Sequence, residues 1–112
     1  MHQPYFTERD ARARREHLRW LILYVLLRFT HDVGANETQL TYTLGAAEGL
    51  EQLTRPELRA AMIYLAEREL IHLERGDHVP IWHAKLTRFG TDVAEYTIEC
   101  DAGIARPLKD WS

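Results

Sequence analysis

The first part of the chain is polar and then strongly apolar, and no glycine or proline interrupts it between Thr7 and Gly34. Thr7 offers a hydroxyl for a helix N-cap, and Asp10 stands where the reciprocal acid of a capping box is found. This pattern predicts a long helix over about residues 8–31. The first half of that helix is charged, whereas residues 18–29 are nearly all apolar.

The apolar side chains of residues 18–29 point in every direction around the helix, at about 100° per residue. This half of the helix therefore needs cover on both sides. The second cover is either another copy of the protein or the rest of the same chain, and in so short a chain we expect another copy. The sequence thus predicts a homodimer whose interface is formed by Trp20, Leu23, Tyr24 and Leu27.

Two shorter helices are predicted after a turn at residues 32–36. Asn36 is a favourable N-cap for a helix over about residues 37–47, and residues 48–53 are predicted to form a linker because glycines weaken the helix there. The sequence Thr54-Arg55-Pro56-Glu57 then combines a capping hydroxyl, a proline in the first turn and an acid at the capping-box position. We predict a helix over about residues 55–69 that buries Leu58, Met62 and Leu65.

The remaining pattern favours a β-hairpin followed by a helix. Residues 70–74 and 79–86 are typical of two strands, and residues 75–78 of the tight turn between them. Thr87 can cap a further helix over about residues 88–96.

The order of these elements and several short motifs resemble a winged helix-turn-helix domain. The string L-T-R-P-E-L-R-A-A-M-I-Y-L-A-E-R-E-L-I-H-L-E resembles the recognition helix and first wing strand of MarR- and ArsR-like regulators. The string A-K-L-T-R-F-G-T-D-V-A-E resembles the entry into the helix after the wing in those families. With the closing D-A-G-I-A-R-P, it is also similar to small winged-helix proteins of Mu-like phages and prophages.

This resemblance implies a single α+β domain that is mainly helical, with a long N-terminal helix and a β-hairpin wing. Residues 1–35 would hold the dimerisation helix, and residues 36–96 the helix-turn-helix and wing. Residues 97–112 would form an irregular C-terminal arm lying on a neighbouring molecule. Two features depart from the families: Glu69 stands where a glycine is usual, and the linker over residues 48–53 is longer than a tight turn.

The resemblance also implies a double-stranded DNA-binding transcription regulator of phage or prophage origin. In such domains the outward face of the recognition helix meets phosphates and base edges, and the wing contacts the backbone. The candidate DNA-binding residues are Arg55, Arg59, Ile63 and Tyr64 on the helix, and Arg75, His78, Lys85 and Arg88 on the wing. Arg59 is the residue that we expect to read a base edge.

Two other interpretations compete with DNA binding. The helix arginines can simply be surface residues paired with Glu57 and Glu67. Alternatively, the domain is a protein-binding module that uses the surface of Ala60, Ile63 and Tyr64 and does not bind DNA.

Composition changes this picture in two respects. At 112 residues, 46% of them hydrophobic and 28% charged, the chain has room for one folded domain. Its net charge of -3 lacks the strong positive field of many nucleic-acid-binding proteins, so DNA contact has to come from a local patch.

The sequence gives no sign of a secreted, membrane or catalytic protein. Cys100 is the single cysteine, residues 1–8 do not resemble a secretory signal, and residues 18–29 are shorter than the roughly 20 that span a bilayer. We therefore expect a cytoplasmic protein with no membrane association. No metal-ligand spacing among the six histidines and no catalytic constellation is recognisable, so we expect no metal, no cofactor and no enzyme activity.

Overall fold

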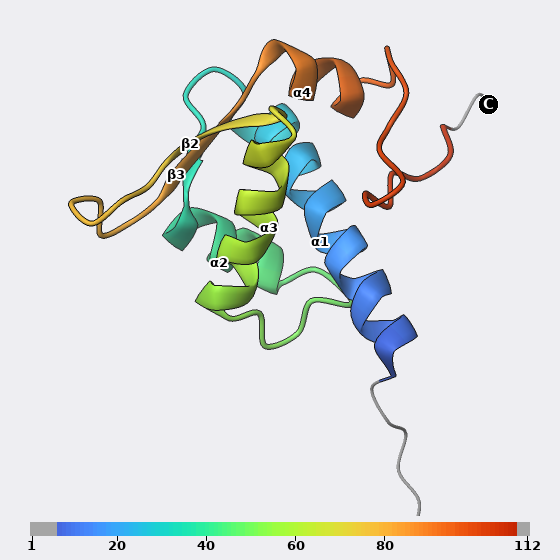
Figure 1. The fold of residues 1–112 in the computed structure, drawn as a ribbon, viewed down its shortest axis with the longest axis horizontal. Coiled ribbons are helices and arrows are strands. Elements are labelled where there is room, and N and C mark those ends of the chain that lie inside the picture. The colour runs from blue at the N-terminus through green and yellow to red at the C-terminus, as the bar shows by residue number, and fades with distance from the viewer. Residues whose placement is uncertain (1–6, 110–112) are drawn as a thin grey trace, which may run out of the picture.

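The helices begin where the sequence provides capping side chains. In the computed structural model, which describes residues 7–109, they are α1 (Glu8–Phe29), α2 (Glu37–Gly45), α3 (Arg55–Glu67) and α4 (Arg88–Ala94). The strands are β1 (Ala35–Asn36), β2 (Ile71–Glu74) and β3 (His83–Leu86), and together they form an antiparallel sheet in the order β1-β3-β2. About half of the described residues are helical, which confirms the expected α+β class (Figure 1). Residues 1–6 and 110–112, at the ends of the predicted segments 1–35 and 97–112, lie outside the described part.

The predicted caps are present, with one difference. Thr7 and Asn36 each form a complete capping box with the residue three positions later, and the Thr87 hydroxyl accepts a hydrogen bond from the Gly90 amide. The Thr54 hydroxyl likewise accepts from the Glu57 amide at 3.3 Å. The Glu57 side chain does not complete the box, because its carboxylate binds Arg14 of α1.

Helices α3 and α4 end in left-handed residues that are not glycine. Glu69 has φ 62°, and the amide of Leu70 donates to the Leu65 carbonyl. Tyr96 has φ 65° at the corresponding place after α4. Both helices therefore stop about two residues before the predicted ends, in the backbone reversal that is typical of helix C-termini.

Helix α1 is covered by its own chain. Leu18, Ile22, Leu23 and Leu26 are at most 1% exposed, and α2, α3, α4 and β3 all pack against this helix. Leu23 is therefore not available to a second copy, which corrects that part of the predicted dimer interface. No helix within residues 7–109 has the length and apolar character needed to cross a membrane.

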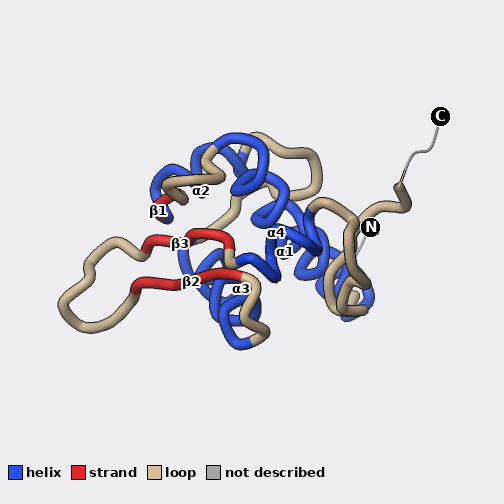
Figure 2. Tube along the Cα trace, turned by 90° about the horizontal axis from the view of Figure 1, so that it is seen from above, coloured by secondary structure: helices blue, strands red, loops and turns tan. Residues whose placement is uncertain are grey.

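The hairpin is shorter in its strands and longer in its loop than predicted. Strands β2 and β3 pair from Ile71↔Leu86 to Glu74↔His83, and residues 75–82 form the loop that projects from the helical body (Figure 2). At Trp82, just before β3, the backbone amide and carbonyl both bond to Glu37, on the side of β3 that faces β1. Strand β1 was not predicted; it lies in the expected turn and pairs with β3.

The segment after α4 lies on its own chain, which corrects the expected arm on a neighbour for residues up to 109. Ile104 is buried, and the amide of Ala105 donates to the carbonyl of Glu16 in α1 at 3.0 Å. The Arg19 guanidinium donates to the Gly103 carbonyl at 2.9 Å. This irregular segment therefore forms part of the cover of α1.

Candidate nucleic-acid interface

The first residue of α2, Glu37, is the only charged residue among the buried side chains of the described chain. Asn36 caps the helix and pairs with β3, and this places the Glu37 side chain beneath the hairpin loop. Its amide donates to the Trp82 carbonyl at 2.8 Å, and its Oε1 accepts from the Trp82 amide at 2.9 Å. Glu37 therefore fixes the end of the loop to the start of α2.

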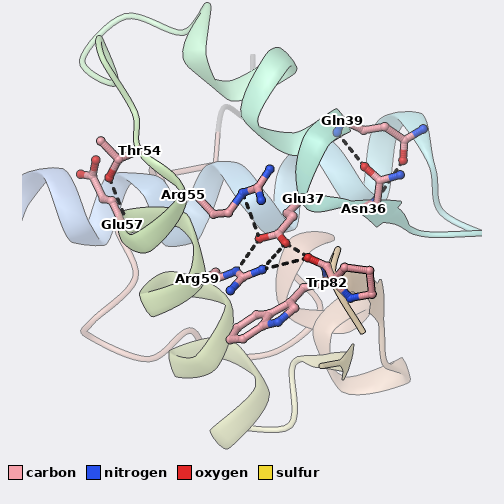
Figure 3. A network of polar contacts seen from close by, with 9 residues as sticks. Asn36, Glu37, Gln39, Thr54, Arg55, Glu57, Arg59 and Trp82 are labelled. Atoms are coloured by element: carbon pink, nitrogen blue, oxygen red, sulfur yellow. Dashed lines mark hydrogen bonds and ion pairs between the residues drawn. The ribbon is translucent and has the colours of Figure 1, made fainter. Parts of the chain in front are cut away.

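The Glu37 carboxylate is held by arginines of α3 (Figure 3). Arg59 forms a bidentate pair with it, with Nε 2.7 Å from Oε2 and Nη2 2.6 Å from Oε1. Arg55 lies farther away, with Nε 4.0 Å from Oε2. The hydrogen bonds from Arg59 hold the pKa of Glu37 below its usual value, against the opposing effect of burial.

Arg59 also contacts the hairpin loop. Its guanidinium lies 4.3 Å from the centroid of the Trp82 ring and donates to the Pro80 carbonyl at 3.3 Å. We call Glu37, Arg55, Arg59 and Trp82 the Glu37 cluster. Because it contains residues of α2, α3 and the segment before β3, the Glu37 cluster holds these three elements in one arrangement.

The ion pairs differ from the alternative predicted from the sequence. Arg59 pairs with Glu37 rather than with Glu57 or Glu67, and Glu57 binds Arg14. The bond to Arg14 lowers the pKa of Glu57. Two acidic groups near the N-terminus of α3 are therefore neutralised inside the protein.

Three of the predicted DNA-binding residues lie near the N-terminus of α3 and the hairpin loop. The Arg55 side chain is 53% exposed, and Arg75 and His78 are exposed in the loop. A groove of about 570 Å³ separates α3 from the loop, and its lining includes Arg59, Arg75 and Trp82. The Arg75 guanidinium lies 5.6 Å from the centroid of the Trp82 ring.

Lys85 and Arg88 are not brought to this groove. Lys85 is exposed on β3 and pairs with His72 in the strand register. Arg88 begins α4, at the opposite end of β3 from the loop, where its Nε lies 4.0 Å from Asp92 Oδ1 (Figure 1). The predicted wing cations therefore divide between the two ends of the hairpin.

Tyr64 belongs to a different contact from the one predicted. Its ring lies between the guanidinium groups of Arg19 and Arg68, each 3.5 Å from the ring centroid, and its hydroxyl donates to Asp101 at 3.0 Å. Tyr64 therefore binds the C-terminal segment and is not an outward DNA-contacting residue. Ile63 is half-buried, and the exposed residues of α3 are Arg55, Pro56, Ala60 and Glu67.

The other predicted interface residues differ in accessibility. Trp20 is buried in the core of its own chain, which corrects its predicted place at the dimer interface, whereas Leu27 is half-buried and Tyr24 is 40% exposed. Within residues 7–109, no group of three or more histidine, cysteine, aspartate or glutamate side chains is placed to hold a metal ion.

Glu37 and Trp82 were missed by the sequence interpretation. A glutamate in the first turn of a helix is ordinarily a solvated residue that favours the helix dipole, so the local pattern gives no sign of its burial. Comparisons of the chain with protein families, with curated proteins and with solved structures find no match.

Proposed function

We propose that this protein is a winged helix-turn-helix regulator that binds double-stranded DNA through the N-terminal part of α3 and the hairpin loop. The order α1-α2-α3-β2-β3-α4 supports it, because helix, helix, linker, capped helix, hairpin and helix is the order that the resemblance implies for such a domain. The observation that carries the proposal is the Glu37 cluster. It fixes α3 and the hairpin loop relative to each other while Arg55 and Arg75 remain exposed.

The contacts around α3 assign different roles to its two arginines. Arg55 has no ion pair closer than the 4.0 Å contact with Glu37, so it is the side chain available to a base edge in the major groove. Arg59 is bound by Glu37 and lies over Trp82, so it positions the loop instead. Arg75 and His78 then face the phosphate backbone.

Local charge supports this proposal despite the net charge of -3. Glu37 and Glu57 lie close to the N-terminus of α3, but Arg59 and Arg14 neutralise them. The exposed acids that remain nearby include Glu51 before α3, Glu74 and Asp77 at the loop, and Glu67 at the end of α3. Repulsion of phosphate is therefore weaker than the sequence alone indicates.

A protein-binding module is the second candidate, and one observation favours it. Beyond the first turn of α3, the accessible face is formed by Ala60, Ile63 and Glu67 and carries no basic residue. A helix that enters the major groove with this face would offer DNA two apolar side chains and one acid beyond its first turn.

Binding of labelled DNA fragments at low and at physiological salt separates the two candidates. The Arg55→Ala variant should lose about 10-fold to 100-fold in affinity for the preferred fragment, because a bidentate base contact is worth about 1–3 kcal/mol. The Arg75→Ala variant should weaken binding to all fragments and reduce the salt dependence by about one phosphate contact.

Arg88→Ala is the matched control, because Arg88 is an exposed arginine at the far end of β3. It should bind DNA as the parent does. If the parent protein binds no fragment at low salt, or if all three variants bind equally, the DNA-binding proposal is wrong and the protein-binding module is favoured.

A further inference from the structure

One side of α1 carries a short row of apolar side chains. Trp20, Tyr24 and Leu27 follow one another at intervals of four and three residues. This is the spacing by which two helices pack along a common seam, and it extends over about 10 Å of helix. Trp20 is buried, Leu27 is half-buried and Tyr24 is 40% exposed, so the row is accessible at Tyr24 and Leu27.

A groove of about 780 Å³ runs beside this row, between α1 and the segment that follows α4. Tyr24 and Leu27 line it on one side, and Tyr96 and Pro107 on the other. The surface therefore combines projecting apolar side chains with a hollow that can receive them.

Two opposite charges lie at the rim of the same groove. Arg28 of α1 and Glu95 after α4 both line it, and both are exposed. Neither forms an ion pair with another residue in the described part of the chain, and the Arg28 guanidinium lies 6.0 Å from the centroid of the Tyr24 ring. A partner for this surface should thus present an acid opposite Arg28 and a base opposite Glu95.

We propose that a second copy of this chain docks on this surface, with the two α1 helices antiparallel about a two-fold axis. A two-fold contact requires one surface to supply both halves of every interaction. This surface does so, because Tyr24 and Leu27 of each copy can enter the groove of the other copy. Arg28 of each copy then meets Glu95 of the other copy, so the dimer contains two such ion pairs.

A second apolar groove lacks this self-complementary character. It lies between α1 and α2, has a volume of about 400 Å³, and is flanked by the exposed rings of Phe29 and Tyr42. All the residues that line it are uncharged, so nothing in it would orient a second copy. It serves as the comparison surface in the test.

The test is the mass of the full chain in solution, measured by light scattering and sedimentation equilibrium at micromolar concentration. The parent protein should be a dimer. Arg28→Glu and Glu95→Arg should each weaken the dimer roughly tenfold or more, because each reversal places like charges opposite each other twice. Both side chains are exposed, and circular dichroism and thermal unfolding of each variant verify that it is folded.

Mixing the two variants makes the test specific. In a mixed dimer the two glutamates of one chain face the two arginines of the other, so equimolar Arg28→Glu and Glu95→Arg proteins should form a dimer together. Tyr42→Ser, on the comparison surface, should leave the mass unchanged. A monomeric parent, a dimer that tolerates both reversals, variants that do not pair on mixing, or a dimer that Tyr42→Ser dissociates would each overturn the proposal. Because these readouts involve no DNA, their failure is distinct from failure of the DNA-binding proposal.

Discussion

Glu37→Gln should destabilise the protein far more than an ordinary change in the first turn of a helix. Glutamine has nearly the same size, so the substitution leaves no cavity. It removes the negative charge that Arg59 binds through two hydrogen bonds, and it places an amide NH₂ group where only acceptors are useful. The Arg59 guanidinium would then remain in place without its counter-charge.

The expected loss is about 3 kcal/mol of unfolding free energy, at the low end of the roughly 3–5 kcal/mol found when one member of a buried ion pair is removed. The low end applies because the Arg59 side chain is 30% exposed and can be partly rehydrated. For a domain of this size, the same loss corresponds to a decrease of about 10 °C in the melting temperature.

The pH dependence provides an independent check on the cause. Because the pKa of Glu37 is lowered in the folded state, its ionised carboxylate stabilises the fold at pH values above the ordinary glutamate pKa of about 4.3. That stabilisation is lost as the pH falls through the lowered pKa. The difference in stability between parent and Glu37→Gln should therefore be constant near neutral pH and decrease in acid.

Urea unfolding followed by circular dichroism, from neutral pH to acid, measures both effects. Glu67→Gln is the matched control, because Glu67 is exposed at the end of α3, and it should change stability by less than about 0.5 kcal/mol. The ion pair between Glu37 and Arg59 does not stabilise the fold as described if Glu37→Gln unfolds at the same urea concentration as this control. The same holds if its loss of unfolding free energy relative to the parent is equal in acid and at neutral pH.

Three further predictions follow from other contacts. Glu69→Gly should stabilise the protein by about 1 kcal/mol, because the residue has φ 62°, and a lower urea midpoint would contradict this. Gly90→Ala should destabilise it by about 2 kcal/mol or more in thermal unfolding, because the new Cβ would lie 1.9 Å from the Leu70 carbonyl oxygen; an unchanged melting temperature would show that α4 can shift freely. Asp101→Asn should speed hydrogen exchange at the Ala105 amide, which donates to Glu16, because it weakens the bonds from Tyr64 and Arg68 to Asp101 that hold the C-terminal segment in place. Exchange at the parental rate would show that these bonds do not hold the segment.

The elements that could be predicted are those specified by neighbouring residues. The N-caps at Thr7, Asn36, Thr54 and Thr87 are each satisfied by an amide three positions later, so a short sequence window contains both partners. The hairpin follows from the same kind of local pattern. The departure at Glu69 was visible as well, because a helix that continues directly into a strand needs a left-handed residue at that place.

The elements that were missed depend on partners far away in the chain. Strand β1 is only two residues long and exists because Ala35 pairs with Ala84. The burial of Glu37 depends in the same way on Arg59 and Trp82, which are brought to it by α3 and the hairpin. No window of local sequence contains these pairs, so the sequence analysis named candidate residues on α3 and the hairpin but missed Glu37.

The way in which α1 is covered has a consequence for the synthesis of the protein. This helix leaves the ribosome before the segments that cover it, with apolar side chains around its second half, and Arg19 meets its partner Gly103 only 84 residues later. At about 5–20 residues per second, translation of that interval takes roughly 4–17 seconds. During this time the nascent helix has no completed core to enter, so it is the segment on which a chaperone would act, and the segment at which aggregation of stalled or truncated chains would begin.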